Sequence, residues 1–187
     1  MFYFLSELML VCVPVTAVAG LYCLFCSKGK YHRYLVWAAA VFLGSMGVWC
    51  GGGVLLRQFG LAWRSAPSLI LIGAVLISGW AGTVFTMICI LKMQQPETNR
   101  YFRWAAKALV AFAAGVILFT TLWASPILLI FGFGDAERVV EYQGQTLLEV
   151  NDGFMDPHYS YYAYHGPIVR GAERVWDGPA PIWGDFD

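Results

Sequence analysis

The stretch Ser68–Leu91, SLILIGAVLISGWAGTVFTMICIL, decides the fold class because it contains no charged residue. A helix of this length, rising 1.5 Å per residue, is long enough to cross the ~30 Å hydrocarbon core of a bilayer. Three further stretches are similarly apolar: Phe2–Cys26, Tyr34–Leu56 and Trp104–Phe131. Because backbone groups in lipid must hydrogen-bond within their own segment, we expect a four-transmembrane-helix bundle over residues 1–131.

Charged residues make up 13% of the 187 residues, whereas a soluble domain contains about 25%. They are also segregated along the chain. Nine of the twelve Lys and Arg lie between Lys28 and Lys107, and ten of the twelve Asp and Glu lie from Asp135 onward. No basic run suggests a nucleic-acid partner, so the lipid bilayer is the expected partner of the apolar part. Residues 132–187 are expected to form a small acidic tail.

Orientation in the membrane follows from the basic residues of the predicted loops. Loop two, between the second and third spans, has only Arg57 and Arg64, whereas loops one and three together have seven basic residues: Lys28, Lys30, Arg33, Lys92, Arg100, Arg103 and Lys107. Cytoplasmic loops are enriched in Lys and Arg, which predicts a multi-pass plasma-membrane protein with both termini extracytoplasmic. The first span is expected to stay uncleaved, because its cations follow the apolar run instead of preceding it.

Small residues recur every four positions in three spans, and such stripes let helix backbones approach closely. They are Gly47 and Gly51 in the second span, Ala74, Ser78 and Gly82 in the third, and Ala111 and Gly115 in the fourth. The stripes predict packing within one bundle or, alternatively, a homo-oligomer or partner-helix face.

Ionisable side chains are scarce inside the spans, which argues against ion-coupled transport. Glu7 lies near the outer end of the first span, and it either pairs with Arg57 or Arg64 or lies at the interface in contact with water. Cys23 and Cys26 form a C-x-x-C pattern that is a weak metal candidate, because buried cysteines usually act as small apolar packing residues. No cofactor is expected.

The tail has the pattern of a small antiparallel β unit. Strands Arg138–Tyr142 and Gln145–Val150 flank a Gln-Gly turn, so that Val140 faces Leu147 and Val139 faces Leu148. Later strands are expected at Tyr159–His165, Ile168-Val169 and Ala172–Trp176, with the last residues loosely ordered.

Aromatic residues of the tail are the candidate interaction residues: Tyr159, Tyr161, Tyr162, Tyr164 and Trp176. Such residues are favoured at binding surfaces, but they also pack against a bundle or bilayer. The acid and histidine residues of the tail, Asp152, Asp156, His158 and His165, do not have the spacing of a known catalytic or calcium motif. No catalytic residue is therefore predicted.

Two segments of the tail, RVVEYQG at Arg138–Gly144 and YYAYHGPIVRG at Tyr161–Gly171, resemble the ending of a set of uncharacterised small multi-span membrane proteins of Gram-positive bacteria. That resemblance implies an extracytoplasmic tail and no particular activity. The sequence as a whole favours a non-enzymatic membrane protein that displays a small extracellular interaction module, in an accessory, envelope or immunity-type role. An oligomeric transport or channel subunit is the alternative, and an enzyme acting at the outer leaflet is a third hypothesis.

Overall fold

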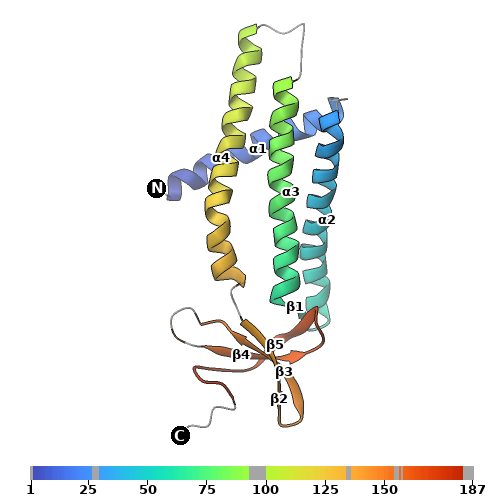
Figure 1. Ribbon diagram of the computed structural model, residues 1–187, viewed down its shortest axis with the longest axis vertical. Helices are drawn as coiled ribbons and strands as arrows, with labels where there is room; N and C mark the ends of the chain where they lie inside the picture. The colour runs from blue at the N-terminus through green and yellow to red at the C-terminus, as the bar shows by residue number, and fades with distance from the viewer. Residues whose placement is uncertain are drawn as a thin grey trace. The chain divides into compact units, whose positions relative to one another are not determined.

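A computed structural model of the chain describes residues 2–26, 30–92, 100–133, 136–153, 156 and 158–182 (Figure 1). The elements are α1 (Phe2–Cys26), α2 (Lys30–Gln58), β1 (Leu61–Trp63), α3 (Ser65–Lys92), α4 (Arg100–Phe133), β2 (Ala136–Tyr142), β3 (Gln145–Asn151), β4 (Tyr159–Tyr164) and β5 (Val169–Gly178). All four helices are long and apolar enough to cross a membrane, and the strands form one antiparallel sheet. The predicted combination of four apolar helices and a β tail is therefore confirmed. Lys28 and the last five positions lie outside the described residues.

The chain forms two compact units, and the boundary between them passes through three helices. The helical unit comprises the described residues of Met1–Gly44 and Ala74–Ser125, and the sheet unit comprises those of Ser45–Gly73 and Pro126–Asp187. The sheet therefore belongs to one unit with the adjoining ends of α2, α3 and α4.

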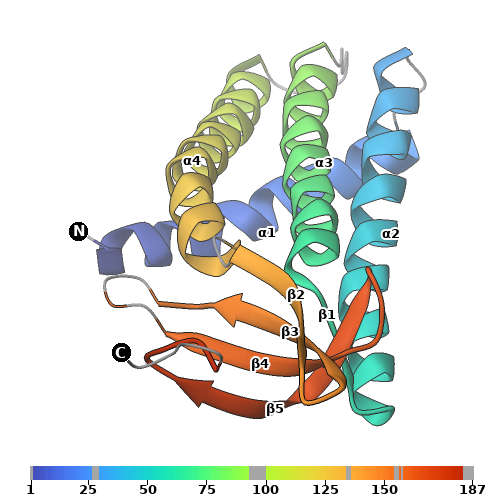
Figure 2. The ribbon, with the colours of Figure 1, turned by 60° about the horizontal axis from the view of Figure 1, so that its bottom comes forward.

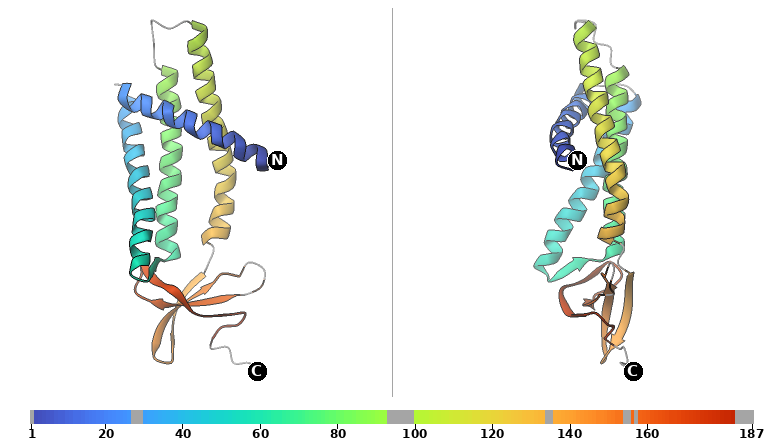
Figure 3. Two further views of the ribbon diagram at one scale, coloured as in Figure 1. Left: turned by 180° about the vertical axis from the view of Figure 1, so that it is seen from behind. Right: turned by 90° about the vertical axis from the view of Figure 1, so that its left-hand side faces the viewer.

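Within the helical unit, α1 crosses α3 and α4 obliquely (Figures 1 and 3). Close approach depends on small side chains, because a Cβ at Gly20 would lie 3.3 Å from the Thr86 hydroxyl oxygen. Cys23 and Cys89 are buried with Leu35 in one apolar cluster. The crossing helices are thus held by tight packing and small buried side chains.

The predicted small-residue stripes have different surroundings. Ser78 is buried and donates a hydrogen bond to the Ala74 carbonyl oxygen, and a Cβ at Gly82 would lie 4.0 Å from the Cβ of Ala38. On α4 the buried small residues are Ala113 and Ala114, rather than the predicted Ala111, which is half-buried, and Gly115, which is exposed. Among the described residues, no heavy atom outside the helix's own nearby backbone would lie within 4 Å of a Cβ at Gly47, Gly51 or Gly115.

The sheet has the strand order β1-β5-β4-β3-β2 (Figure 2). The predicted hairpin register is confirmed, because Val139 pairs with Leu148 and Val140 pairs with Leu147. Gln143 has φ 49° and Gly144 has φ 78°, the positive values that a two-residue type I′ turn requires at both central positions. Glycine at the second position avoids the steric cost of that conformation.

One strand prediction was wrong and one strand was missed. Val169 and Ala172–Trp176, expected in two short strands, lie in a single strand, β5, whereas Ile168 precedes it. The irregular register of β5 against β4 interrupts the local pattern. Strand β1 was not predicted at all, although it pairs with Val169–Gly171 at one edge of the sheet. A strand of three residues between two helices has too short a pattern to recognise from sequence.

A buried carboxylate joins the sheet to the beginning of α3. Glu137 of β2 accepts hydrogen bonds from the Ser65 backbone N–H at 2.8 Å, the Ser65 hydroxyl at 2.7 Å and Arg64 Nε at 2.8 Å. Arg64 also donates to the Gly166 carbonyl oxygen at 3.2 Å. Arg64, one of the two candidate partners of Glu7, therefore pairs with Glu137. The Glu137 carboxylate caps the first turn of α3.

The environment of Glu137 favours its charged form. Burial alone raises the pKa, but the hydrogen bonds from Ser65 and Arg64 outweigh it and hold the pKa below the usual 4.5. A group with a lowered folded-state pKa stabilises the fold above its unfolded pKa and loses that contribution as the pH falls through the folded value. The junction therefore contributes stability at neutral pH and loses it in acid.

Replacing Glu137→Gln is expected to destabilise the sheet unit by about 2 kcal/mol at neutral pH, because the Arg64 guanidinium loses its buried charged partner. Amide hydrogen exchange of β1 and β5 in detergent should then become about thirtyfold faster. Glu141→Gln, an exposed position on the same strand, is the matched control and should leave exchange unchanged. Equal exchange rates for wild type and Glu137→Gln at neutral pH would contradict the role assigned to this carboxylate. The difference between the two should shrink in acid, as the pH falls below the usual glutamate pKa of 4.5 and through the lowered pKa of Glu137.

Candidate functional site

The tyrosine-dense strand β4 lies at the centre of the sheet. Tyr161 is fully buried and Tyr162 is 9% exposed, whereas Tyr159 and Tyr164 are half-buried. Tyr162 packs with Leu148 and Val150, and Tyr164 lies against the same cluster. Two of the four candidate interaction tyrosines are therefore core residues, and only Trp176, at 37% exposed, is clearly open to solvent.

The Tyr161 side chain fastens the C-terminal segment to the sheet. Its hydroxyl donates to Glu149 Oε2 at 2.7 Å and accepts from the Ile182 backbone N–H at 3.1 Å. The Trp176 ring packs edge-on against it, with centroids 5.5 Å apart. Burial, followed by the hydrogen bond to Glu149, raises the pKa of Tyr161 to about 12. Tyr161 is therefore a neutral structural group at physiological pH.

Cations cover the rings of two further tyrosines on this strand. The Arg170 guanidinium lies 3.8 Å from the Tyr162 ring centroid, and the Arg64 guanidinium lies 5.7 Å from that of Tyr164. Buried Nε and Nη1 of Arg170 have no hydrogen-bond partner within the described part of the chain. The electron-rich face of the Tyr162 ring instead stabilises the Arg170 charge through a cation–π contact.

An ionic cluster closes the loop between β3 and β4. Asp152 accepts from Ser160 at 2.9 Å and contacts His158 Nδ1 at 2.7 Å, while Arg174 contacts Asp177 at 3.3 Å. Burial raises the pKa of Asp152, but the hydrogen bonds from His158 and Ser160 outweigh it and lower the pKa.

The hydrogen-bond partners within the ionic cluster show whether it could act as a catalytic set. The Ser160 hydroxyl donates to Asp152 and not to His158, so His158 is not placed to act as a base for that hydroxyl. Asp156 and His165, the other members of the predicted acid–histidine set, are exposed and form no ion pair with the cluster among the described residues. The contacts therefore tie Asp152, at the end of β3, to His158 and Ser160, at the beginning of β4, and serve a structural role.

The clearest candidate surface is the part of β5 that extends past β1. Strand β1 pairs only with Val169–Gly171, whereas β4 pairs with β5 as far as Gly178. All six residues from Ala172 to Asp177 are exposed, including Val175 at 56% and Trp176 at 37%. The Ala172 backbone N–H still donates to the Gly60 carbonyl oxygen at 2.8 Å. We therefore call residues 173–177 the open β5 edge, because no strand of the described chain pairs with them on the β1 side.

The other sequence candidates do not converge on a site. Glu7 and Arg57 are exposed, and Arg64 is used at the Glu137 junction. Cys23 is buried in the helical unit and Cys26 is exposed, and the described residues contain no group of three metal-ligating side chains. The open β5 edge was missed as a site because it depends on how far the unpredicted strand β1 extends.

Comparison with known proteins gives no relative, since no family model, curated protein or solved structure matches the chain. The resemblance of the tail to small Gram-positive membrane proteins therefore stays a prediction.

Replacing Tyr161→Phe is expected to destabilise the sheet unit by about 1.5 kcal/mol, because a buried Glu149 carboxylate and the Ile182 N–H both lose a partner. Amide exchange of β4 and β5 in detergent should become about tenfold faster. The control is Tyr159→Phe, at a half-buried position on the same strand. An equal effect of the two substitutions would contradict the fastening role of the Tyr161 hydroxyl.

Proposed function

We propose that this chain is a non-enzymatic integral membrane protein that displays its sheet outside the cytoplasm as an interaction module. The proposed partner is another membrane or secreted protein, from which an extended segment pairs with the open β5 edge. Such a protein would serve in an accessory, envelope or immunity-type role. The observation that favours this function is the exposed stretch of β5 that β1 leaves unpaired.

Strand pairing supports the proposed topology. Strand β1 lies in the connection between α2 and α3, and β5 follows α4, yet the two strands are hydrogen-bonded neighbours. In a membrane, two paired strands would lie on the same side, which is consistent with α3 and α4 crossing it once each. The excess of basic residues in loops one and three favours the extracytoplasmic side for the sheet, and with α1 as a fourth crossing, for both termini.

The chemistry of the open β5 edge supports strand addition as the binding mode. An exposed strand edge presents unpaired backbone N–H and C=O groups, and partner strands use these groups for affinity. The side chains of Val175 and Trp176 add exposed apolar surface, whereas Glu173 and Asp177 are charged. Charged residues on an edge discourage self-association, which favours a specific partner over aggregation.

One observation favours the alternative of an oligomeric transport or channel subunit. On α2, a Cβ at Gly47 or Gly51 would have no heavy atom of the described residues within 4 Å, apart from the helix's own nearby backbone, so this helix face is open to a second helix. A homo-oligomer formed through α2 would leave the open β5 edge free. A cysteine at Val175 would then react equally fast in cells and in purified protein.

Single cysteines at Val175 and Thr146, both exposed, separate topology from partner binding when the five native cysteines are replaced by serine. With a membrane-impermeant maleimide, both positions are expected to react in intact cells. Val175→Cys should react at least about fivefold more slowly in cells than in purified protein in nanodiscs, because the partner strand covers it. Thr146→Cys, at the hairpin end of β3, should react equally in the two settings and is the matched control.

The location of the sheet and the presence of a partner strand are contradicted by different results. Reaction of Thr146→Cys only after lysis would contradict the extracytoplasmic location of the sheet. Equal rates for Val175→Cys in cells and in nanodiscs, with Thr146→Cys reacting in intact cells, would contradict a partner strand at β5 while leaving the topology standing.

A further inference from the structure

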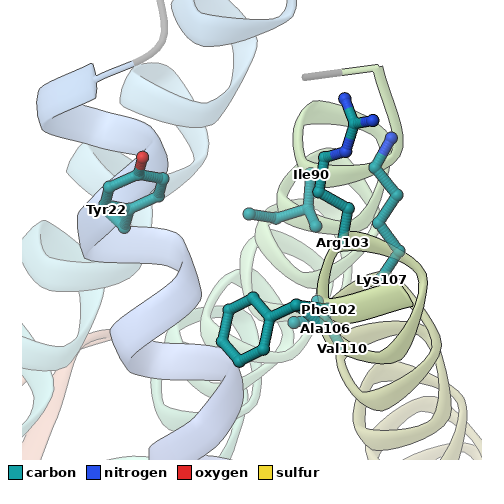
Figure 4. Close-up of a pocket in the computed structure, with 7 residues that line it drawn as sticks. All are labelled: Tyr22, Ile90, Phe102, Arg103, Ala106, Lys107 and Val110. Carbon is teal, nitrogen blue, oxygen red and sulfur yellow. The ribbon is translucent and has the colours of Figure 1, made fainter. Parts of the chain in front are cut away.

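An open-sided cavity of about 240 Å³ is formed within the helical unit by residues of α1, α3 and α4 (Figure 4). Its wall is formed by Tyr22, Ile90, Phe102, Arg103, Ala106, Lys107 and Val110. Figure 4 shows Tyr22 on the α1 side of the cavity and the α4 residues across from it. The cavity is therefore built from three predicted spans and is not a feature of the sheet.

The wall of the cavity has an apolar part and a cationic end. Tyr22, Ile90, Phe102 and Val110 give an apolar and aromatic lining, whereas the two cations are one turn apart on α4 and extend toward its beginning (Figure 4). No acidic residue is among the wall residues. An apolar lining with paired cations at one end matches an amphipathic anion better than a small soluble one.

The cations lie in the first turns of α4, at one end of a helix that is long and apolar enough to span a membrane. Arg103 and Lys107 lie three and seven residues after the first residue of α4, or about 5 and 10 Å along the helix. Next to them Tyr101 is 84% exposed, Phe102 69% and Trp104 67%. Exposed aromatic side chains of this kind gather where a helix passes from hydrocarbon to the headgroups.

The position of Lys107 is fixed by a contact across helices. Its Nζ donates to the Leu91 carbonyl oxygen in the last turn of α3 at 2.8 Å. A lysine ammonium has three donors, so this bond leaves donors for a second acceptor. The ammonium is thus held beside the cavity instead of being dispersed in solvent, and Arg103, with its five donors, completes the cationic end.

We propose that this cavity binds one anionic phospholipid, with the lipid phosphate at Arg103 and Lys107 and an acyl chain along Tyr22, Phe102 and Val110. Basic pockets between membrane helices bind anionic headgroups because the charges meet where water is scarce. The exposed lipid-facing surface of α4 gives the acyl chain a path into the surrounding bilayer. The site is separate from the sheet and does not depend on a protein partner.

Native mass spectrometry of the full chain in detergent, titrated with phosphatidylglycerol or phosphatidylcholine, tests this site. Wild type is expected to bind the first phosphatidylglycerol about thirtyfold more tightly than phosphatidylcholine, given about 1 kcal/mol for each cation. The double variant Arg103→Gln/Lys107→Gln should lose most of this preference. Arg33→Gln/Arg100→Gln removes two exposed cations outside the cavity and should keep it.

Two further measurements keep the result interpretable. Arg103→Lys/Lys107→Arg retains both charges and should retain the preference, whereas a general folding defect would lower the thermal midpoint of the Gln variant and abolish binding of both lipids. Millimolar inorganic phosphate should compete weakly, because it lacks the acyl chain. Equal loss of preference in both Gln variants, no preference in wild type, or full displacement by inorganic phosphate would each overturn the proposal.

Discussion

The buried carboxylate of Glu137 joins two parts of the chain that are 72 residues apart in sequence. It accepts three hydrogen bonds, two from Ser65 and one from Arg64, so its charge is fully compensated although its side chain is only 8% exposed. A buried charge without such partners would cost several kcal/mol, so the sheet and the beginning of α3 are favourable only together. The pairing of β1 with β5 extends this junction along the sheet edge.

The junction of the sheet with the beginning of α3 also explains how a tail without cysteine residues forms a sheet. A unit of about 50 residues buries too little apolar surface to be stable alone. The sheet gains its fifth strand from the connection between α2 and α3, and Tyr161 binds the chain past β5 through Ile182. Two tyrosines that were candidates for a binding surface are thereby used for stability, whereas the side chains of β5 beyond the reach of β1 stay exposed.

Local patterns in the sequence predicted the elements that local physics determines. Four uncharged or nearly uncharged stretches gave the helices, and the Gln143-Gly144 turn gave the hairpin register, because each signal lies within one segment. Contacts between distant segments have no such signal, and β1 and the partnership of Arg64 with Glu137 were missed for that reason. The periodicity of small residues was likewise uninformative about packing. Gly82 approaches Ala38, whereas no other helix of the described residues approaches Gly47 within 4 Å of a Cβ.

The pairing of β1 with β5 is tested most directly by a disulfide. Ala62 and Arg170 are opposite one another in the two strands, so cysteines at these positions would have Cβ atoms about 5 Å apart, within reach of a disulfide after small adjustments. In a chain without the native cysteines, mild oxidation should join Ala62→Cys to Arg170→Cys within one molecule, and should not join Ala62→Cys to Glu173→Cys, which is about 10 Å further along β5. Failure of the first pair to cross-link, or equal cross-linking of both pairs, would contradict a sheet that shares a strand with the connection between α2 and α3.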